Sequence, residues 1–355
     1  MSHDARLTTH STVSASLALC DEGALRELVD AAVPIGFGHG GKSALLNVAG
    51  TTVFVKRVPL TDLEMRPENV RCTANLFGLP VFCQYGIGGP GFGAWRELAV
   101  HTMTTDWVVK GVHEGFPLLY HWRVLPDSTP LPEQLADIER AVAYWGGGEQ
   151  VRHRIEALRQ SPASIALFLE YLPQNLHQWL RGQVESGDEA TCRALTMVEK
   201  GLAEGTAFMN SRGLLHFDAH FDNILTDGRR LYFTDYGLAV SSRFELSQGE
   251  TGFFDRHQTY DRCYTATYLV NWLVTALYGY QPEDREGRSA LVRAFAEGKR
   301  PTGVPAAAAA ILARDARIAT VMSDFNRKLR YESRSTPYPL EEIRRIGGVY
   351  GPPAD

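Results

Sequence analysis

The chain has 355 residues, 44% of them hydrophobic and 22% charged, and its formal net charge is −5. This near-average composition excludes disordered, coiled-coil and collagen-like chains, and the mildly acidic balance argues against nucleic-acid and membrane-surface partners. No apolar run approaches the roughly 20 residues that a membrane-spanning helix needs. The N-terminus lacks the basic region of a signal peptide, and the 5 cysteines are scattered without a CxxC pair, so we expect a cytoplasmic protein with reduced thiols.

The first half of the chain is predicted to form a lobe with a small sheet. Residues 1–21 have the character of a polar tail, and the lobe itself is expected over 22–172. Runs of β-branched and apolar residues on either side of the turn signal Ala49-Gly50 predict an antiparallel hairpin. Residues 126–162 are charged and follow a helical pattern, which predicts a helical insertion. The expected elements are a helix over 22–32, strands over 44–48 and 51–58, a helix over 94–109, and strands over 116–125 and 165–172.

The second half, residues 173–355, is predicted to be a mainly helical lobe. An amphipathic pattern over 190–211 and an apolar pattern over 264–278 predict long helices, and a short strand is expected over 230–235. A β-rich half followed by an α-rich half predicts an α+β chain of two lobes that join near residues 170–173. The length of the chain also suits two lobes.

Segment 36–43, with the sequence GFGHGGKS, matches the Walker A pattern of P-loop NTPases, which would assign phosphate binding to Lys42 and Ser43. That motif needs a strand before it and a helix after it, whereas here a helix is expected to precede and a strand to follow. Residues 86–91 match the dinucleotide-binding fingerprint GxGxxG, but the regular alternation of strands and helices of that fold does not follow. Neither motif has the context that its chemistry requires.

A third interpretation of the first glycine-rich segment does have the required context. Gly36, Gly38 and Gly41 lie in a predicted hairpin loop, and the strand that follows carries Lys56. In this arrangement a glycine-rich loop covers the phosphates of ATP, and a lysine on the strand reaches the α- and β-phosphates. Lysine is rare in this arginine-rich chain, so its presence at position 56 gives additional support to this interpretation.

The strongest functional pattern lies in the second half of the chain, within residues 214–237. Asp218 is followed five residues later by Asn223, and Asp235 comes twelve residues after Asn223, at the end of a predicted β-hairpin. Oxygens of Asn and Asp side chains are suitable ligands for Mg²⁺, a cation that also binds phosphate oxygens. Asp218 would then remain available to accept the proton of a hydroxyl group.

The order and spacing of these residues resemble the protein-kinase-like superfamily over about residues 33–280. Residues 216–223 (HFDAHFDN) look like its catalytic loop, and residues 235–237 (DYG) look like its metal-binding D-F-G motif. The resemblance implies a two-lobed protein-kinase-like fold, with a small antiparallel-sheet N-lobe and a mainly helical C-lobe, and it implies ATP and Mg²⁺ as cofactors. It also implies these roles: Asp218 as the base, Asn223 and Asp235 as Mg²⁺ ligands, Gly36, Gly38, Gly41 and Lys56 at the phosphates, Glu97 as the partner of Lys56, the backbone of Glu170 and Leu172 at the adenine, and Asp261 as the anchor of the catalytic loop.

Departures from the protein-kinase pattern indicate the subtype. His220 stands where Ser/Thr protein kinases usually carry lysine, and in this it resembles aminoglycoside phosphotransferases and related small-molecule kinases. Phe217 replaces an arginine, no A-P-E motif follows residue 237, and residues 238–260 have no obvious counterpart. His220 has two interpretations, a contact to phosphate and a packing role.

The resemblance implies an ATP- and Mg²⁺-dependent transfer of the γ-phosphoryl group to a hydroxyl acceptor, with a small molecule favoured over a protein. Acidic residues expected near the acceptor side, Glu185, Asp188 and Asp255, would suit a cationic, ring-containing molecule. A Ser/Thr protein kinase shares the same catalytic residues and is the first alternative. A nucleotide-binding scaffold without turnover is the second, although no base or metal residue is missing. The sequence leaves the acceptor and the oligomeric state open.

Overall fold

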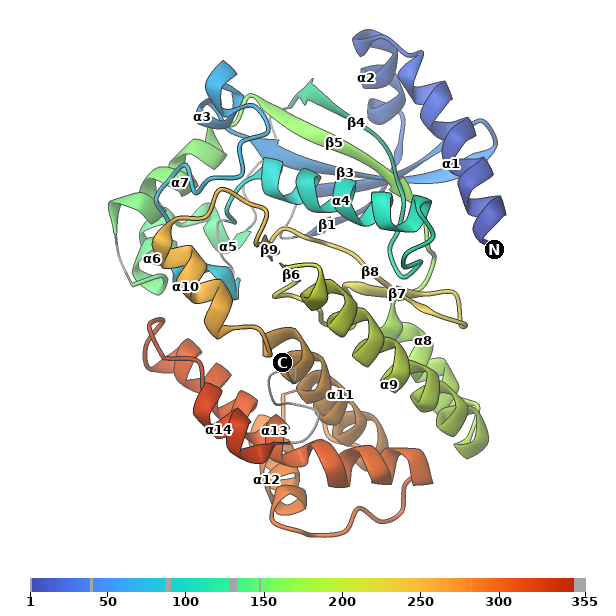
Figure 1. Ribbon diagram of the computed structural model, residues 1–355, viewed down its shortest axis with the longest axis vertical. Helices are drawn as coiled ribbons and strands as arrows, with labels where there is room; N and C mark the ends of the chain where they lie inside the picture. Colours follow the sequence, from blue (N-terminus) through green and yellow to red (C-terminus); the bar gives the residue numbers. More distant parts are fainter. Residues whose placement is uncertain are drawn as a thin grey trace. The chain divides into compact units, whose positions relative to one another are not determined.

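The computed structural model describes residues 2–38, 41–86, 91–127, 133–146, 148–281 and 283–347. It is an α+β structure with a five-stranded antiparallel sheet and many helices (Figure 1). The chain divides into two compact units: unit 1 contains Met1–Leu172 and Thr234–Glu250, and unit 2 contains Pro173–Phe233 and Thr251–Asp355. The chain first passes from unit 1 to unit 2 between residues 172 and 173, within the range where the sequence predicted the boundary between the lobes. Residues 234–250, expected in the C-terminal lobe, belong instead to unit 1.

The sheet of unit 1 has the strand order β1-β2-β3-β5-β4, and each pair of neighbours is antiparallel. Strands β2 and β3 are joined by the predicted turn at Ala49 and Gly50, whose φ angles of 51° and 80° match a type I′ hairpin turn. Strand β1 was not predicted, because the short run before the glycines is too brief to show a period. The bounds are β1 Val33–Gly38, β2 Gly41–Val48, β3 Thr51–Leu60, β4 Leu119–Pro126 and β5 Ala163–Glu170.

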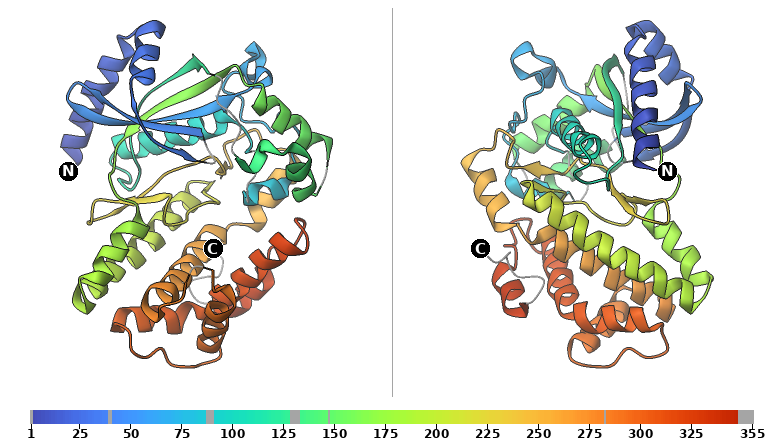
Figure 2. Two further views of the ribbon diagram at one scale, coloured as in Figure 1. Left: turned by 180° about the vertical axis from the view of Figure 1, so that it is seen from behind. Right: turned by 45° about the vertical axis from the view of Figure 1, so that its right-hand side comes forward.

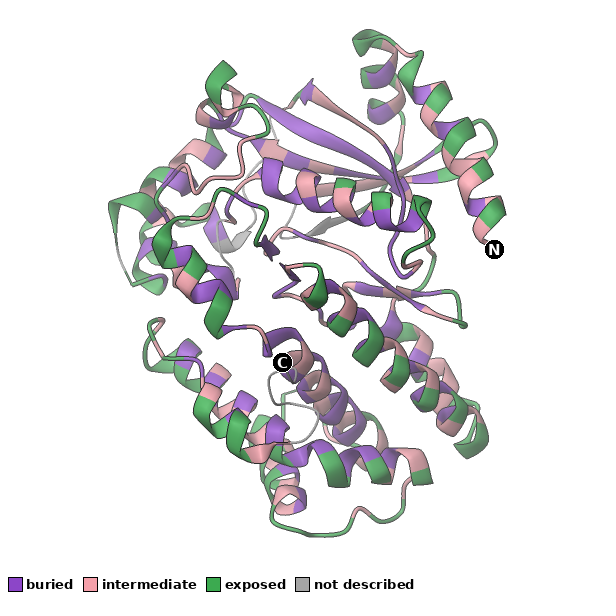
Figure 3. Cartoon of the chain, in the orientation of Figure 1, coloured by how far each residue is buried: buried purple, intermediate pink, exposed green. Residues whose placement is uncertain are grey.

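One face of this sheet carries the core of unit 1. Side chains of a strand alternate between the two faces, and Val58 and Leu60 of β3 face the same way as Ile165 and Leu167 of β5. They pack against helix α4, Ala94–Val109, which begins and ends where the sequence predicted. Helix α4 is buried over much of its length (Figure 3). Lys56 is two residues before Val58 in β3, so its side chain lies on the same face of the sheet.

The start of α4 is fixed by a buried carboxylate. Gly93, the residue before the helix, has a φ of 133° and offers no side-chain cap. Oε1 of Glu64 accepts a hydrogen bond from the amide of Ala94 at 3.0 Å, and a Cβ on Gly93 would lie only 2.7 Å from that oxygen. Glycine at this position therefore allows the carboxylate to reach the helix N-terminus, where it also interacts favourably with the helix dipole.

The predicted insertion forms helices α5 Glu133–Ala136, α6 Ile138–Tyr144 and α7 Glu149–Arg159. Trp145 and Ile155 of this segment pack into a buried cluster with Phe77. Arg154 of α7 donates to Oε2 of Glu64 at 2.8 Å, and both side chains are at most 3% exposed. Burial would raise the pKa of Glu64, but Arg154 and Thr61 outweigh burial and the pKa is lowered. The insertion therefore supplies the cation that keeps the cap of α4 ionised.

The polar tail expected over residues 1–21 is wrong. Residues His3–Ala18 form helix α1, which packs along β4 in unit 1 (Figure 2), and α2 follows over Glu22–Asp30. The buried face of α1 consists of Arg6, Val13 and Leu17. An arginine among the core positions weakens the hydrophobic period, and this is why the sequence pattern did not predict the helix. Between β3 and α4 the chain contains α3 Asp62–Met65 and two 3₁₀ helices, Pro67–Asn69 and Val81–Tyr85.

Unit 2 is mainly helical, as predicted, and its core lies among α9, α11 and α13. Strands β7 and β8 form a short antiparallel hairpin. Among the described residues, no helix has both the length and the apolar character to cross a membrane. The remaining elements are α8 Leu176–Glu185, α9 Asp188–Ser211, β6 Leu214–Leu215, β7 Ile224–Thr226, β8 Leu231–Phe233, β9 Val240–Ser241, α10 Gln248–Arg256, α11 Tyr260–Tyr278, α12 Arg285–Ala296, α13 Ala306–Tyr331 and α14 Leu340–Ile346.

Replacing Arg154 tests the capping arrangement. Arg154→Ala leaves the carboxylate of Glu64 buried without its cation, and we expect a loss of about 3–5 kcal/mol in the free energy of unfolding. Urea titration measures this loss. The matched control is Arg152→Ala, on the same helix, whose ion pair with Glu139 is exposed to solvent. We expect the control to behave as wild type, and equal losses in the two variants would contradict the role of Arg154.

Candidate functional site

Unit 1 brings Lys56, Glu97 and Asp235 together. Nζ of Lys56 on β3 donates to Oε1 of Glu97 on α4 at 2.6 Å and to Oδ1 of Asp235 at 2.8 Å. The side chains of Lys56 and Glu97 are 8% and 2% exposed, whereas that of Asp235 is 39% exposed. The pair that the sequence predicted between Lys56 and Glu97 is therefore present, and Asp235 joins it from the D-Y-G segment.

The charges of this group are unbalanced. Burial alone would lower the pKa of Lys56, but Asp235 and Glu97 outweigh it, so the pKa is raised and the ammonium keeps its proton. Burial raises the pKa of Glu97, and Lys56 opposes that shift. One ammonium facing two carboxylates leaves a formal charge of −1, and the more exposed carboxylate, that of Asp235, is the one that can accept a further cation.

Helix α4 also holds the chain that follows Asp235. The buried ring of Tyr236 lies edge-on to His101, with ring centroids 4.8 Å apart, and its hydroxyl bonds to Thr104. Arg96 donates to Oε1 of Glu250 at 2.7 Å, and both side chains are at most 6% exposed. Residues 238–250, for which the sequence offered no counterpart, are therefore anchored to the helix that carries Glu97.

Unit 2 contains the predicted catalytic loop. Nδ2 of Asn223 donates to the carbonyl oxygen of Asp218 at 3.0 Å and to its Oδ2 at 3.1 Å. The amide nitrogen of Asn223 thus faces Asp218. The side chain of Asp218 is 33% exposed. A carboxylate that is fixed and still reachable has the properties of a general base.

The loop is anchored by Asp261 at the start of α11, as the resemblance implied. The amides of His216 and Phe217 donate to its two carboxylate oxygens at 2.6 and 2.8 Å. Phe217 has a φ of 64°, an unusual value for a residue with a side chain, so the loop needs this support. Burial raises the pKa of Asp261 to about 6, and the two amide hydrogen bonds oppose that shift.

Two departures from the protein-kinase pattern have a structural explanation. Phe217 stacks on Tyr260, with ring centroids 4.5 Å apart, and on Phe253, so aromatic packing holds the position that carries arginine in many protein kinases. His220 stacks on Tyr268, accepts the amide hydrogen of Asp222 through Nδ1 at 3.2 Å, and has Nε2 3.8 Å from Oδ2 of Asp218. The packing interpretation of His220 thus has direct support, and the same ring lies beside the candidate base.

The remaining predicted nucleotide residues lie at the ends of strands. Gly36 and Gly38 belong to the end of β1 and Gly41 to the start of β2, where Gly38 pairs with Gly41. The tip of this hairpin, residues 39–40, lies outside the described residues. Glu170 ends β5, and its carboxylate is bound by Arg6, a residue that the sequence did not mark as functional. Leu172 is the last residue of the first segment of unit 1.

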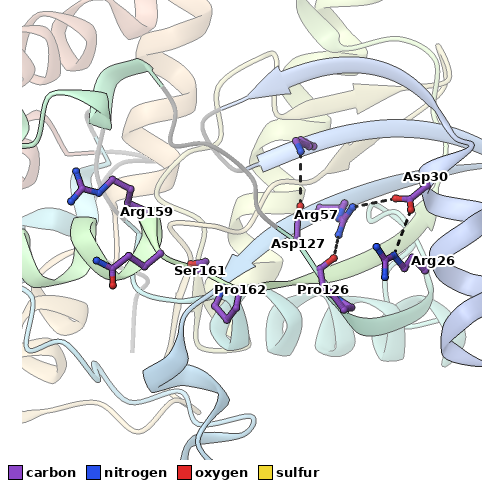
Figure 4. A pocket seen from close by; sticks show the side chains of 10 residues that line it. Arg26, Asp30, Arg57, Pro126, Asp127, Arg159, Ser161 and Pro162 are labelled. Atoms are coloured by element: carbon purple, nitrogen blue, oxygen red, sulfur yellow. Dashed lines mark hydrogen bonds and ion pairs between the residues drawn. The ribbon is translucent and has the colours of Figure 1, made fainter.

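The structure gives the two alternative glycine motifs no matching context. Strand β2, not a helix, follows residue 41, and Lys42 pairs across the sheet with Arg57 while Ser43 pairs with Lys56. Lys42 and Lys56 therefore face opposite sides of the sheet. Lys42 and Arg57 line an open hollow of about 710 Å³, where Asp127 lies 3.9 Å from Lys42 (Figure 4). In the second motif, Gly86 ends a 3₁₀ helix rather than a strand, and residues 87–90 are outside the described part of the chain.

The two expected Mg²⁺ ligands belong to different units, Asn223 to unit 2 and Asp235 to unit 1. Over the part of the chain that the structure describes, no group of three or more His, Cys, Asp or Glu side chains is arranged to hold a metal ion. Glu185, Asp188 and Asp255, named as acidic residues of the acceptor side, are exposed, and no contact connects them with Asp218 in the described structure. Burial raises the pKa of Tyr264 and of Tyr268 on α11, and the negative charge of Asp218 raises both pKa values further.

Comparison with known proteins adds no family assignment, since no protein-family model and no curated protein matches the chain.

Removing the carboxylate of Asp261 tests the anchoring of the predicted catalytic loop. In Asp261→Ala two buried amides lose their acceptor, and each unsatisfied group costs about 1–3 kcal/mol, so we expect a loss of about 2–5 kcal/mol in the free energy of unfolding. The exposed Asp255, near the end of α10, provides the control variant Asp255→Ala. Chemical denaturation measures both, and a stability of Asp261→Ala equal to that of the control would refute the anchor.

Proposed function

We propose that the protein is an ATP- and Mg²⁺-dependent phosphotransferase that moves the γ-phosphoryl group of ATP to a hydroxyl group of a small molecule. The observation that carries this proposal is the buried Lys56 ammonium held between Glu97 and Asp235. Burying an ion pair seldom gains stability over apolar packing. A lysine on a strand, paired with a helix glutamate and with the aspartate of a D-Y-G segment, therefore points to phosphate binding in addition to its structural role.

The residues fit the cofactors that this function requires. Asp235 and Asn223 offer side-chain oxygens, the ligand type that Mg²⁺ prefers. The formal charge of −1 on Lys56, Glu97 and Asp235 together would favour a cation at Asp235, and Lys56, oriented by Glu97, would be available to bind the α- and β-phosphates. The glycines at the ends of β1 and β2 permit close approach of the backbone to phosphate oxygens. Mg²⁺, when bound, supplies charge neutralisation at the phosphates.

The chain itself contributes position and a proton acceptor. Asp218, fixed by Asn223, orients the acceptor hydroxyl and takes its proton. The acceptor oxygen forms a bond to the γ-phosphorus, the bond from that phosphorus to the oxygen bridging to the β-phosphate breaks, and ADP leaves. Little covalent chemistry is asked of the protein, so orientation and electrostatic stabilisation account for the rate.

Three features favour a small acceptor over a protein. Phe217 and its aromatic neighbours occupy the place of an arginine that senses phosphorylation, residues 238–250 are packed on α4, and no A-P-E motif is present. Next to Asp218, the half-buried rings of Tyr264 and Tyr268 with the exposed carboxylate of Asp222 would suit a cationic molecule that contains a ring.

The two lysines of the hairpin provide the first test. Lys56→Ala removes the phosphate contact, and we expect transfer to fall below detection, whereas Lys42→Ala on the opposite face keeps near wild-type activity. Transfer is measured with γ-labelled ATP and Mg²⁺ on aminoglycosides, nucleosides, amino alcohols and sugars, and on generic protein substrates. Activity lost at Lys42 and kept at Lys56 would overturn the proposed function. Label on serine or threonine of a protein, and on no small molecule, would identify a protein kinase instead.

The two aspartates separate catalysis from binding. Asp218→Asn keeps the shape of the side chain and removes the base, so we expect turnover to fall by roughly 10²–10⁴ while Mg²⁺-dependent binding of ATP persists. Asp235→Asn should weaken that binding itself, because it removes a charged ligand of the cation. Calorimetric titration with a non-hydrolysable ATP analogue, with and without Mg²⁺, measures binding. Wild-type turnover in Asp218→Asn would favour a nucleotide-binding scaffold.

A further inference from the structure

Helix α1 presents three polar side chains to the edge of the sheet. Arg6, His10 and Ser14 are spaced by four residues and therefore share one face of the helix. Oγ of Ser14 donates to the carbonyl oxygen of Tyr120 at 2.7 Å, and Nε2 of His10 lies 3.2 Å from the carbonyl oxygen of Leu119. Strand β4 is an edge strand, so these contacts satisfy carbonyl groups that have no neighbouring strand.

Arg6 is buried and makes the largest number of hydrogen bonds among these three side chains. It is 1% exposed, and its Nε and Nη2 donate to Oε1 and Oε2 of Glu170 at 2.9 and 2.7 Å. The same guanidinium donates to the carbonyl oxygens of Glu114 and Phe116 at 3.0 and 2.6 Å. Such a two-pronged pair fixes orientation as well as distance, because both groups are planar.

Glu170 in turn is hydrogen-bonded to the main chain of Leu118. Its Oε2 also accepts the amide hydrogen of Leu118 at 3.1 Å, and its own amide donates to the carbonyl oxygen of Leu118 at 2.8 Å. The end of β5 is thus held at both its side chain and its backbone. Apolar residues could close the end of a sheet at a lower desolvation cost, so a buried arginine at this place indicates that position, rather than stability alone, is what the contact provides.

We propose that Arg6 is a positioning residue for recognition of the nucleotide base. This inference rests on the proposed function, together with the role that the resemblance implies for the backbone of Glu170 and Leu172, which is to read adenine. By fixing the carboxylate of Glu170, Arg6 sets the backbone of residues 170–172 at the place where β5 ends. The N-terminal helix is then part of the nucleotide site, although it supplies no residue that touches the nucleotide. Its loss should affect discrimination between bases more than affinity for phosphates.

Binding measurements on the full chain test this inference without knowledge of the acceptor. Non-hydrolysable analogues of ATP and GTP, and inorganic tripolyphosphate, are titrated with Mg²⁺ into wild type and into Arg6→Ala and Arg6→Lys. We expect the preference for the ATP analogue over the GTP analogue to fall about tenfold in Arg6→Ala, equivalent to about 1.4 kcal/mol, and to fall also in Arg6→Lys. Affinity for tripolyphosphate should stay within twofold of wild type. Arg6→Lys keeps the positive charge but not the two-pronged pair with Glu170, so the same measurement can be made on it if Arg6→Ala does not fold.

Ser14→Ala is the matched control, because Ser14 lies on the same face of the same helix but contacts Tyr120 rather than Glu170. It should keep the wild-type preference. Folded Arg6 variants with an unchanged preference, or an equal loss in Ser14→Ala, would overturn the role of Arg6. Wild type that binds both analogues equally would overturn this inference and leave the proposed function standing. Wild type that binds neither analogue would refute the proposed function, and the inference with it.

Discussion

The structure of unit 1 depends on one buried ammonium group. Lys56 emerges from the central part of the sheet among apolar side chains, and it is stable there only because Glu97 and Asp235 approach it from a helix and from a distant segment of the chain. The buried carboxylate of Glu97 needs the same cation in turn, because a buried charge without a partner is costly. Strand β3 and helix α4 therefore depend on each other.

This requirement explains how much of the surrounding structure holds helix α4 in place. Glu64 caps its first turn and is itself kept ionised by Arg154 of the insertion. Arg96 and Glu250 tie the helix to the segment after the D-Y-G residues. A shift of α4 along its axis would break several buried charge contacts together, so the position of Glu97 is set cooperatively rather than by its own ion pair alone.

The same principle appears at the sheet edge, where Arg6 and Glu170 are paired across more than 160 residues of sequence. Charged pairs between distant segments recur in unit 1, and each has at least one member near the end of a strand or helix or in the chain beside one. Elements at these places would otherwise be free to adjust by small amounts, since apolar packing tolerates shifts that a hydrogen-bonded ion pair does not. Such pairs suit a site that must place several groups accurately.

The sequence by itself determined the α+β class, the join at residues 172 and 173, the bounds of α4 and the pair between Lys56 and Glu97. The class and the bounds follow from local periods, which are short-range properties of the chain, whereas the pair between Lys56 and Glu97 was implied by the resemblance to the protein-kinase-like superfamily. The sequence did not determine helix α1, the return of residues 234–250 to unit 1, or the partners of Arg6, Arg96 and Arg154. A buried arginine looks like a surface residue in a pattern of polar and apolar positions, and only the tertiary structure brings its carboxylate to it. The roles of these charges could be decided only by contacts between segments far apart in the sequence, because the energy that holds a buried charge comes from its partner and not from its neighbours along the chain.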